Sequence, residues 1–481
     1  MDVGRHPKIR LLAYSEVEGV EGEMGNFRIR VRKKARYVDE NKCTGCGSCA
    51  EKCPTVVCDA YNVGLAKRKA IYKYFAQGIP SVYTIDAAHC RNFETGKKCG
   101  LCSRICQAGA IDYQQEDRIV ELDVGAIILA TGYELFDARK VPEYGYGRLP
   151  NVVTSLEFER FLSASGPTGG HVYKPSDLAV SEVLATLEKQ MRTSSREIER
   201  FEKTFEMSSE RFIEKFNSGE LTGGHYDEWA GQYRSFLPLK EKFKRTKERA
   251  ESLKTAHRLA FIQCVGSRDS RFNGHCSAFC CMHSIKEAVI AREHDPESEV
   301  HIFGMDIRAV GKNFEEYRNR AEGEAGIKFI RSRVAEVTEN DSHNPVIWYE
   351  DTKARQVRSM EVDMAILAVA CEPGPSARRL SELLGVPLNE FGFYATLTVP
   401  PLDTFRPGVF ACGCAHGPMD IPESVAQASS AAARAASALM GARSKEQGAG
   451  SGEQDAESRK QVAGSEDHGA KAKKREAGKG E

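Results

Sequence analysis

The sequence predicts an α/β protein in which a cysteine-rich module and a helical segment interrupt two related domains. Three observations carry this prediction. Two series of strands end in similar apolar strands, VGAIILATG at residues 124–132 and VDMAILAVACEPG at residues 362–374. Nine of the sixteen cysteines lie between Cys43 and Cys106. Residues 178–256 are rich in Glu, Lys and Arg at helical spacing.

The strands predict how the domains are organised. Residues 26–33 alternate apolar and basic side chains, which is typical of a half-buried strand, and residues 118–124 are predicted to be the next strand. The other predicted elements are strands at 257–265 and 299–303, a helix at 284–294, and a second meander at 327–337, 346–350 and 357–371. Two meanders with matching exits predict two dinucleotide-binding-type domains.

Composition narrows the function classes. Lys+Arg and Asp+Glu are both 68, so the chain lacks the basic surplus that nucleic acid or an anionic membrane would attract. No apolar stretch is long enough to span a membrane, and the N-terminus does not resemble a secretory signal. We therefore expect a cytoplasmic protein, in which sixteen cysteines are not expected to form disulfides and metal is the better explanation.

The first cysteine run is the most specific motif in the chain. Cys43, Cys46, Cys49 and Cys53-Pro54 follow the pattern C-x2-C-x2-C-x3-C-P, which is typical of a two-cluster 4Fe–4S ferredoxin. Gly45 and Gly47 allow the loop to turn tightly around a cluster. A zinc site or a set of idle thiols is disfavoured, because zinc motifs use paired C-x2-C units.

A second run follows at Cys90, Cys99, Cys102 and Cys106, with a longer first gap and Gln107 in place of proline. In the two-cluster pattern the fourth cysteine of each run crosses to the other cluster. The two predicted ligand sets are therefore Cys43, Cys46, Cys49 and Cys106 for cluster 1, and Cys90, Cys99, Cys102 and Cys53 for cluster 2. Cys58 is interpreted as an extra, buried thiol.

The flanking segments resemble flavoproteins of the disulfide-reductase type. The strand that ends in Ala130-Thr131-Gly132 resembles the one that follows their β-meander, and residues 404–413 (TFRPGVFACG) resemble their strand at the flavin ribityl and phosphate. Asp420 is predicted to cap a helix that begins at Ile421 and ends near Met440. The resemblance implies FAD contacts at Ala130, Thr131, Gly132, Gly413, Asp420 and Ile421. An ordinary structural helix is an equally good interpretation of the last segment.

A dinucleotide-binding turn is the missing element. No G-x-G-x-x-G follows a predicted strand, and the second domain reads Gln263-Cys264-Val265-Gly266-Ser267-Arg268 where such a turn would stand. NAD(P)H binding is therefore disfavoured.

Longer stretches resemble the A subunit of heterodisulfide reductase, which is its flavin and iron–sulfur subunit. They include RHPKIRLLAYSEVEGVEGEMGNFRIRVRKKARYV, the first cysteine run, EYGYGRLPNVVTSLEFERFLSASGPTGG, AFIQCVGSR, CSAFCCM, MDIRAVGK and GVFACGCAHGPMDIPESVAQA, over residues 1–178 and 257–440. Relatives begin with a flavin-binding G-x-G-x-x-G region, so the chain is expected to be N-terminally truncated or half of a split flavoprotein. They also lack residues 178–256, which we interpret as a helical hairpin that serves as a docking surface or as a solvated face.

The remaining cysteines leave alternatives open. Cys264, Cys276, Cys280 and Cys281 are either buried thiols or additional redox or cluster cysteines, although adjacent cysteines are poor ligands for one cubane. Cys371, Cys412 and Cys414 are expected to be structural. The predicted domains are 1–36, 116–177 and 401–442 for the flavin domain, 37–115 for the ferredoxin module, 178–256 for the helical insertion, 257–400 for the second dinucleotide-binding-like domain, and 443–481 for a disordered tail.

The resemblance implies a protein that relays electrons through two 4Fe–4S clusters to or from FAD. Its implied partners are other heterodisulfide reductase-like subunits and donors such as hydrogenase, formate dehydrogenase or NADH-oxidising proteins, with the disulfide chemistry on those partners. Two alternatives remain. One is a ferredoxin-type carrier or scaffold without flavin, and the other is an NAD(P)H:acceptor reductase subunit.

Overall fold

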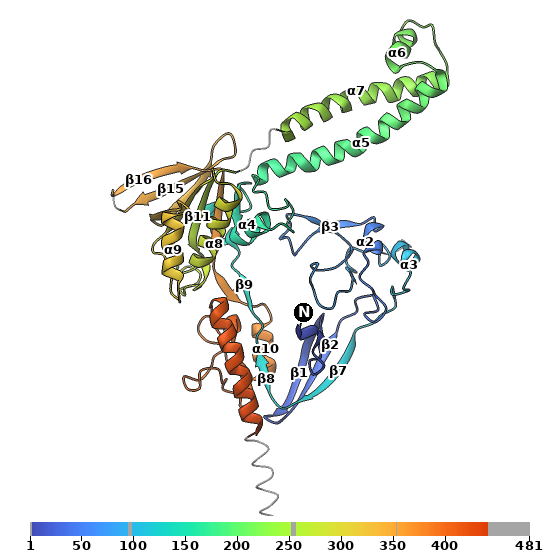
Figure 1. Ribbon diagram of the computed structural model, residues 1–481. Helices are drawn as coiled ribbons and strands as arrows, with labels where there is room; N and C mark the ends of the chain where they lie inside the picture. Colours follow the sequence, from blue (N-terminus) through green and yellow to red (C-terminus); the bar gives the residue numbers. More distant parts are fainter. Residues whose placement is uncertain (1, 95–98, 252–255, 353, 441–481) are drawn as a thin grey trace, which may run out of the picture. The chain divides into compact units, whose positions relative to one another are not determined.

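The computed structural model describes residues 2–94, 99–251, 256–352 and 354–440 (Figure 1). The chain forms two compact units. Unit 1 comprises Met1–Leu135, His275–Phe279 and Cys371–Glu481, whereas unit 2 comprises Phe136–Gly274 and Cys280–Ala370. Each unit is therefore built from segments that are far apart in the sequence.

An antiparallel meander forms one part of unit 1. A short helix, α1 (Asp2–Arg5), precedes β1 (Ser15–Glu23), β2 (Asn26–Lys33) and β7 (Arg118–Val124), with β2 in the centre. Phe27 and Val31 of β2 are buried, while the arginines between them lie on the other, more exposed face. The predicted strands at 26–33 and 118–124 are confirmed with the bounds that were predicted.

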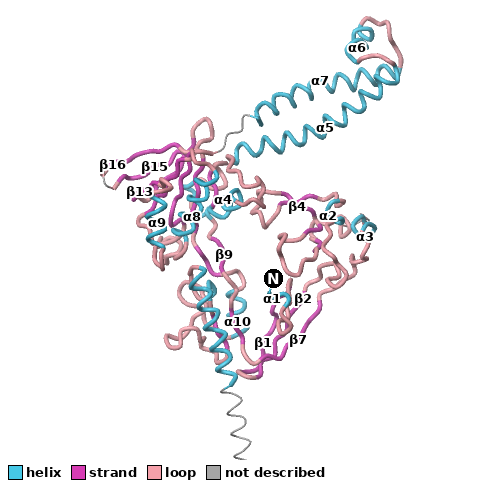
Figure 2. Tube along the Cα trace, in the orientation of Figure 1, coloured by secondary structure: helices cyan, strands magenta, loops and turns pink. Residues whose placement is uncertain are grey.

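The cysteine-rich module, residues 34–117, is a long connection between β2 and β7. Lys33 pairs with Arg118, so the chain leaves and re-enters the meander at the same end. The Asp117 carboxylate accepts a hydrogen bond of 2.8 Å from the Ala35 backbone N–H and ties the two crossings together. Loops connect the short elements of the module (Figure 2). These are α2 (Ser48–Glu51), β3 (Val56–Cys58), β4 (Lys67–Lys69), β5 (Ile71–Tyr72), β6 (Thr84–Ile85) and α3 (Leu101–Ile105).

The rest of unit 1 holds two small sheets and two helices. β8 (Ile127–Leu129) is parallel to β19 (Val409–Ala411), and β9 (Tyr133–Leu135) is antiparallel to β18 (Cys371–Pro373). The chain continues through α10 (Ala377–Leu384), the 3-10 turn η3 (Gly413–Ala415) and a helix over 421–440. Ala431 and Ala435 of that last helix pack against Phe410 of β19. The helix predicted from Ile421 is confirmed.

A five-stranded parallel sheet forms the centre of unit 2, in the order β10–β17–β11–β12–β13. Its strands are β10 (Val152–Thr154), β11 (Arg258–Val265), β12 (Glu299–Gly304), β13 (Lys328–Arg331) and β17 (Met364–Val369). β11 and β17 are buried almost throughout, as expected of central parallel strands. The sheet order is that of a doubly wound, dinucleotide-binding-type domain.

Helices and a second meander surround this sheet. The helices are α4 (Ser155–Leu162), α8 (Cys280–His294) and α9 (Phe314–Gly323), seen beside the sheet in Figure 1. The meander β14 (Val334–Glu339), β15 (Pro345–Asp351) and β16 (Gln356–Glu361) connects β13 to β17. Two 3-10 turns, η1 (Ala138–Lys140) and η2 (Pro142–Tyr144), precede β10. The predicted succession of a meander and an apolar exit strand therefore occurs in both units.

Two predicted strands are each divided in the structure. Residues 327–337 form β13 of the parallel sheet and β14 of the meander, with a break at the buried Ser332, whose N–H bonds to the Gly304 carbonyl. Residues 357–371 likewise form β16, β17 and the first residue of β18. The break is at Asp363, whose carboxylate accepts the backbone N–H groups of His257 (3.0 Å) and Arg258 (2.9 Å). Both apolar runs therefore change sheets without a Gly or Pro to mark the change.

The composition of the units also differs from the predicted domains. Residues 136–177, predicted within the flavin domain, lie in unit 2, because β10 pairs with β17 there. Residues 371–400, predicted within the second domain, lie in unit 1, where β18 pairs with β9. The predicted disordered tail at 443–481 lies outside the described residues.

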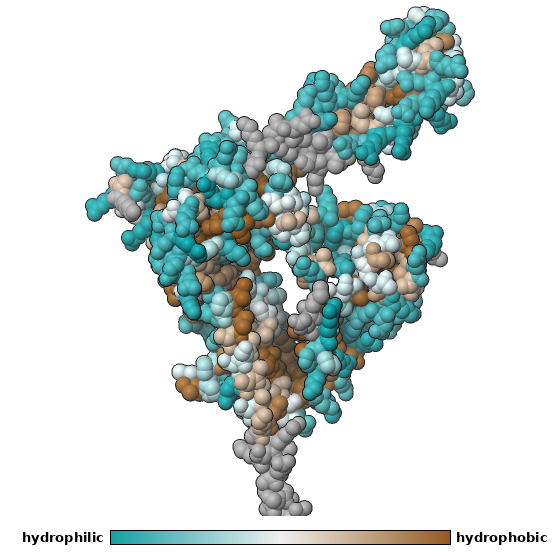
Figure 3. All heavy atoms as spheres, viewed as in Figure 1, coloured by the Kyte–Doolittle hydropathy of each residue, from teal (hydrophilic) through white to brown (hydrophobic). Residues whose placement is uncertain are grey.

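The insertion is helical, as predicted, and the first of its helices begins at Pro175. It consists of α5 (Pro175–Phe205), α6 (Ser209–Asn217) and α7 (Gly224–Glu251), and α5 and α7 pack side by side (Figure 2). Phe212 stacks on Trp229 with ring centroids 3.8 Å apart, and the Trp229 indole N–H donates to Ser209 Oγ at 3.2 Å. Hydrophilic residues dominate the visible surface of the insertion (Figure 3). Its apolar side chains therefore form a core of their own at one end.

No helix in the part of the chain that the structure describes combines the length and apolarity that crossing a membrane requires.

We predict that Trp229→Ala unfolds the end of the insertion without disturbing the cysteine-rich module. The indole is fully buried and stacks on three phenylalanines, so its removal should cost this local core about 3–5 kcal/mol. Hydrogen exchange should rise in α6 and in the facing parts of α5 and α7. Leu237→Ala, at a half-exposed position of α7, is the control. Equal loss of protection in residues 34–117 would contradict the prediction.

Candidate iron–sulfur site

The first cysteine run folds as a loop followed by one helical turn. Gly45 (φ +72°) and Gly47 (φ +91°) both have left-handed backbones, which glycine adopts without strain. A Cβ at Gly45 would lie 2.6 Å from the Ser81 carbonyl oxygen, so no other residue fits without a shift. α2 begins immediately after Gly47 and buries Cys49, whereas Cys46 is exposed.

The second run repeats this local structure. Gly100 (φ +60°) stands between Cys99 and the helical turn α3, which buries Cys102. Each run therefore contains Cys-Gly-x-Cys with a left-handed glycine and its last cysteine at the second position of a helical turn. α2 and α3 pack against each other. The two runs thus form a pair of similar loops, although their first gaps differ in length.

One apolar core holds cysteines from both runs. Cys49 and Cys102 are buried in it beside Ile71 and Ile85 of strands β5 and β6. Other cysteines pack at its edge, namely Cys43, Cys53, Cys90 and Cys106. Cys106 Sγ also accepts a hydrogen bond of 3.4 Å from the Ala110 backbone N–H. Six of the eight predicted ligands therefore share this core, while Cys46 is exposed and Cys99 is half-buried.

A cavity in this core is lined by four cysteines, Cys53, Cys90, Cys99 and Cys102. Its volume is about 20 Å³. Tyr113 also lines it, and its hydroxyl lies 2.8 Å from Cys102 Sγ. These are the four cysteines that the sequence assigned to cluster 2, and Cys53 is the one that belongs to the other run.

Tyr83 lies beside the first loop, with its hydroxyl oxygen 3.2 Å from where a Cβ on Gly47 would stand. Burial raises the pKa of Tyr83, and the charges of Cys49, Cys46 and Cys43 raise it further. The Cys46 thiol has a lowered pKa because the Ser48 backbone N–H and hydroxyl hydrogen-bond to its sulfur. The first loop therefore offers amide hydrogen bonds to sulfur, as iron–sulfur sites do.

Burial opposes ionisation of the inner cysteines. It raises the pKa of Cys49 to about 12, and the neighbouring charges of Cys102, Cys43 and Cys46 raise it as well. Burial likewise raises the pKa of Cys90 and of Cys102. Metal binds thiolate rather than thiol. The iron ions of a cluster would therefore supply the positive charge that stabilises these buried sulfurs as thiolates. The donor set, four cysteines that line one cavity and a hydrogen-bonded Cys46 sulfur, thus fits an iron–sulfur cluster.

The described part of the chain forms no site for a single metal ion. Among the described residues, no three His, Cys, Asp or Glu side chains converge as the ligands of one ion would. A cubane requires a different layout, because each of its cysteines binds a separate iron atom.

The residues that the flavoprotein resemblance singled out meet at one edge of unit 1. Ala130, Thr131 and Gly132 follow β8, and Gly413 follows the adjacent parallel strand β19. The carboxyl ends of parallel strands are where such folds bind ligands. Gly413 has a left-handed backbone (φ +64°), and its N–H donates to Gln427 Oε1 at 3.0 Å.

The helix over 421–440 begins beside this edge. Asp420 caps it, as predicted, because its carboxylate accepts the Glu423 N–H at 2.8 Å. Ile421 is 80% exposed. His416 lies 3.0 Å from the Thr396 hydroxyl and 3.4 Å from the Gln427 side-chain amide. Neither His416 nor Gln427 was found by sequence reasoning, because an isolated His or Gln gives no pattern.

In the part of the chain that the structure describes, the cysteines outside the module do not form a cluster site. Cys276 lies in unit 1, while Cys264, Cys280 and Cys281 lie in unit 2. Cys280 and Cys281 are buried at the start of α8, and a hydrogen bond from Cys280 lowers the pKa of Cys281 to about 7. Cys58 was expected to be buried, but it is exposed, because β3 belongs to a two-stranded ribbon that covers neither face of the strand.

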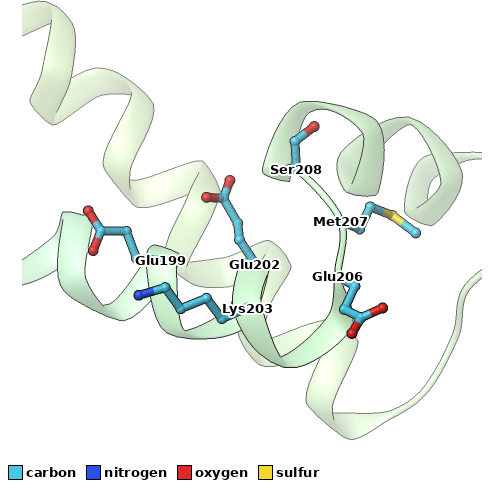
Figure 4. Close-up of a pocket in the computed structure, with 6 residues that line it drawn as sticks. All are labelled: Glu199, Glu202, Lys203, Glu206, Met207 and Ser208. Carbon is cyan, nitrogen blue, oxygen red and sulfur yellow. The ribbon is translucent and has the colours of Figure 1, made fainter.

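A hollow at the end of α5 carries no redox chemistry. It is lined by Glu199, Glu202, Lys203, Glu206, Met207 and Ser208 (Figure 4). Glu202 accepts the Ser209 N–H at 2.8 Å and so stabilises the turn into α6. The hollow is a product of that turn.

The family of 4Fe–4S binding domains matches residues 36–58, which contain the whole first cysteine run. With the fold and the cavity, this match defines the class: an iron–sulfur protein built on dinucleotide-binding-type α/β units. Most of the chain is, more narrowly, homologous to part of the A subunit of heterodisulfide reductase, as its curated relatives show.

Three relatives illustrate the likeness. The iron–sulfur A subunit of CoB–CoM heterodisulfide reductase from Methanocaldococcus jannaschii is 39% identical over 90% of this chain and 54% of the relative. The corresponding A 2 protein of Methanopyrus kandleri is 41% identical over 91% and 55%. The A subunit of the H2:CoB–CoM heterodisulfide,ferredoxin reductase from Methanothermobacter thermautotrophicus is 38% identical over 91% and 54%. The chain thus spans about half the length of the curated relatives it matches.

Solved structures offer only a partial likeness. Thioredoxin reductase from Lactococcus lactis is 21% identical, with a TM-score of 0.28, over 38% of this chain and 52% of that one. Thioredoxin reductase from T. acidophilum gives 20% identity and a TM-score of 0.27 over 38% and 51%. Overlap of this extent carries no argument about function.

We predict that Gly45→Ala reduces cluster content, because the new Cβ would collide with the Ser81 carbonyl at a left-handed position. Iron and acid-labile sulfide per chain should fall by about half or more, as expected for loss of one loop. Gly64→Ala is the matched control, since Gly64 also has a positive φ (+84°) but open space around it. Equal iron content in the two variants would show that the close approach at Gly45 is unimportant.

Proposed function

We propose that this chain is an electron-transfer subunit that carries two 4Fe–4S clusters and relays electrons to or from a flavin within a heterodisulfide reductase-like complex. The observation that carries the proposal is the cavity lined by Cys53, Cys90, Cys99 and Cys102. Four thiols from two separate runs face one space, which a disulfide framework or a set of idle thiols does not explain.

The ligand sets follow the crossed pattern. Cys90, Cys99, Cys102 and Cys53 would hold one cluster, and their meeting around one cavity supports this set. Cys43, Cys46, Cys49 and Cys106 would hold the other, supported by the place of Cys43, Cys49 and Cys106 in the shared core. Bound clusters supply one-electron redox chemistry. The chain supplies the thiolates, the amide hydrogen bonds and the burial that tune their potentials.

The flavin would lie at the carboxyl edge of β8 and β19. Ala130, Thr131, Gly132 and Gly413 stand at that edge. The first turn of the helix over 421–440 would place its positive end toward the ligand, which favours negative charge on a reduced flavin. The parallel sheet here has two strands in the described residues, fewer than a dinucleotide site usually has. We therefore infer that FAD needs a further segment or a partner protein.

Partners follow from the same proposal. The chain would dock with other heterodisulfide reductase-like subunits and accept electrons from a hydrogenase- or dehydrogenase-type donor. Relatives are named for H2 and for ferredoxin, which fits such donors. The disulfide chemistry would lie on partner subunits. Sixteen free cysteines fit a reducing cytoplasm.

A ferredoxin-type carrier or scaffold without flavin is the second candidate. The small parallel sheet of unit 1 and the absence of a G-x-G-x-x-G sequence favour it. The third candidate, an NAD(P)H:acceptor reductase subunit, is disfavoured by the turn after β11. There the Phe136 ring lies against Gly266, 2.4 Å from where a Cβ would stand, and fills space over the turn.

Cysteine variants test the crossed ligand sets. Cys53→Ser and Cys99→Ser should perturb the same low-temperature EPR signal of the reduced protein, because their sulfurs line one cavity. Cys49→Ser and Cys106→Ser should perturb the other signal. Cys58→Ser, at an exposed position of the module, is the control and should change neither. If Cys53→Ser alters the signal that Cys49→Ser alters and leaves the Cys99 signal untouched, the crossed sets are wrong.

We further predict that the purified chain binds FAD weakly, with less than one FAD per chain under anaerobic conditions. The reason is the two-stranded parallel sheet, which offers only part of a dinucleotide site. Flavin fluorescence titration measures the affinity. Tight one-to-one binding would contradict the need for a further segment, and complete absence of binding would support the carrier without flavin.

A further inference from the structure

Tyr113, at the cavity lined by the four cysteines, makes a contact with sulfur that the binding of a cluster does not itself require. Tyr113 Oη lies 2.8 Å from Cys102 Sγ, within hydrogen-bonding distance, and both side chains are partly buried. Cys102 is one of the four cysteines that line the cavity. The phenol therefore lies at the cavity itself, against one of its four cysteines.

Backbone contacts fix where Tyr113 lies. Ile111 forms a β-bridge with Val38, and the Asp112 N–H donates to the Tyr37 carbonyl at 3.1 Å. The Tyr113 ring packs edge-on against Phe93, with centroids 5.9 Å apart. Phe93 in turn packs against Tyr37 at 4.5 Å. The ring of Tyr113 is thus held between the backbone bridge and the Tyr37–Phe93 pair, with its hydroxyl toward sulfur.

The direction of the hydrogen bond follows from the chemistry of the two groups. A cysteine that binds iron is a thiolate and has no proton to donate. A tyrosine hydroxyl, whose ordinary pKa is about 10, keeps its proton at neutral pH. Tyr113 therefore donates and Cys102 accepts.

Such a donor favours the reduced state of a cluster. Reduction adds one negative charge, part of which resides on the ligand sulfurs, and a hydrogen bond to sulfur becomes stronger as that charge grows. In a cavity with little solvent, few other donors compensate for the loss of one. Removal of the hydroxyl should therefore make reduction harder.

We propose that Tyr113 is the positioning residue that raises the reduction potential of the cluster held by Cys53, Cys90, Cys99 and Cys102, by donating a hydrogen bond to Cys102 Sγ. This inference rests on the proposed function, because it requires that cluster to be bound. It distinguishes the two clusters, because Tyr113 contacts Cys102, which belongs to only one of the two predicted ligand sets.

The test is an anaerobic redox titration of Tyr113→Phe, followed by low-temperature EPR. At a fixed solution potential, the ratio of reduced to oxidised cluster should fall about tenfold for one signal, which is a shift of about 59 mV to more negative potential. The other signal should keep its midpoint. The signal that shifts should be the one that Cys99→Ser perturbs.

Tyr37→Phe is the matched control, because it removes a hydroxyl from the same aromatic group without touching the Tyr113–Cys102 contact. Its two midpoints should equal those of the unchanged protein. Unaltered midpoints in Tyr113→Phe, or an equal shift in Tyr37→Phe, would overturn the role of Tyr113 while leaving the clusters in place. Absence of two cluster signals from the unchanged protein would instead overturn the proposed function.

Discussion

The cysteine-rich module depends on sulfur atoms packed at the centre of elements that are too short to fold alone. α2 has four residues, α3 has five, and its strands have two or three. Isolated helices and hairpins of this length are unstable in water. Cys49 and Cys102 take central positions in the core, where a larger domain would place leucine or isoleucine. Bound clusters would then complete the core as well as carry electrons.

The base of the module shows how the fold supports it. Lys33 and Arg118 pair in the meander, and beyond them the Tyr37 N–H donates to Gln115 Oε1 at 2.6 Å. Lys33 and Arg36 both form ion pairs with the half-buried Glu40. The module is therefore attached at a stiff, hydrogen-bonded stem. That attachment fixes the module to the meander while its interior depends on its own sulfur atoms.

Local patterns in the sequence predicted some features well. The alternation in β2 and β7 set their bounds. The four cysteines that the spacing assigns to cluster 2 line one cavity, while their ligation of a cluster stays a prediction. The repeat of Cys-Gly-x-Cys at Gly47 and Gly100 was also present in the sequence and could have shown that both runs adopt one local structure. These features depend on short segments whose chemistry is local.

Features that depend on pairing between distant strands were not predictable. β10 is three residues long, and only its partner β17 places it in unit 2. The runs at 327–337 and 357–371 each change sheets at a polar residue with no turn signature. Cys58 is exposed because no other element of the described chain packs over β3 at that position. The role proposed for Tyr113 depends on the position of Cys102 Sγ, which lies eleven residues away in the sequence. One-dimensional patterns carry no information about such neighbours.

The central claim is that this chain holds two 4Fe–4S clusters. Native mass spectrometry of the anaerobically purified full chain tests it most directly, because the mass reports the number and kind of bound clusters. The account predicts a dominant species with two 4Fe–4S clusters per chain. A dominant species with zinc, or with one cluster and free thiols at Cys90, Cys99 and Cys102, would contradict it.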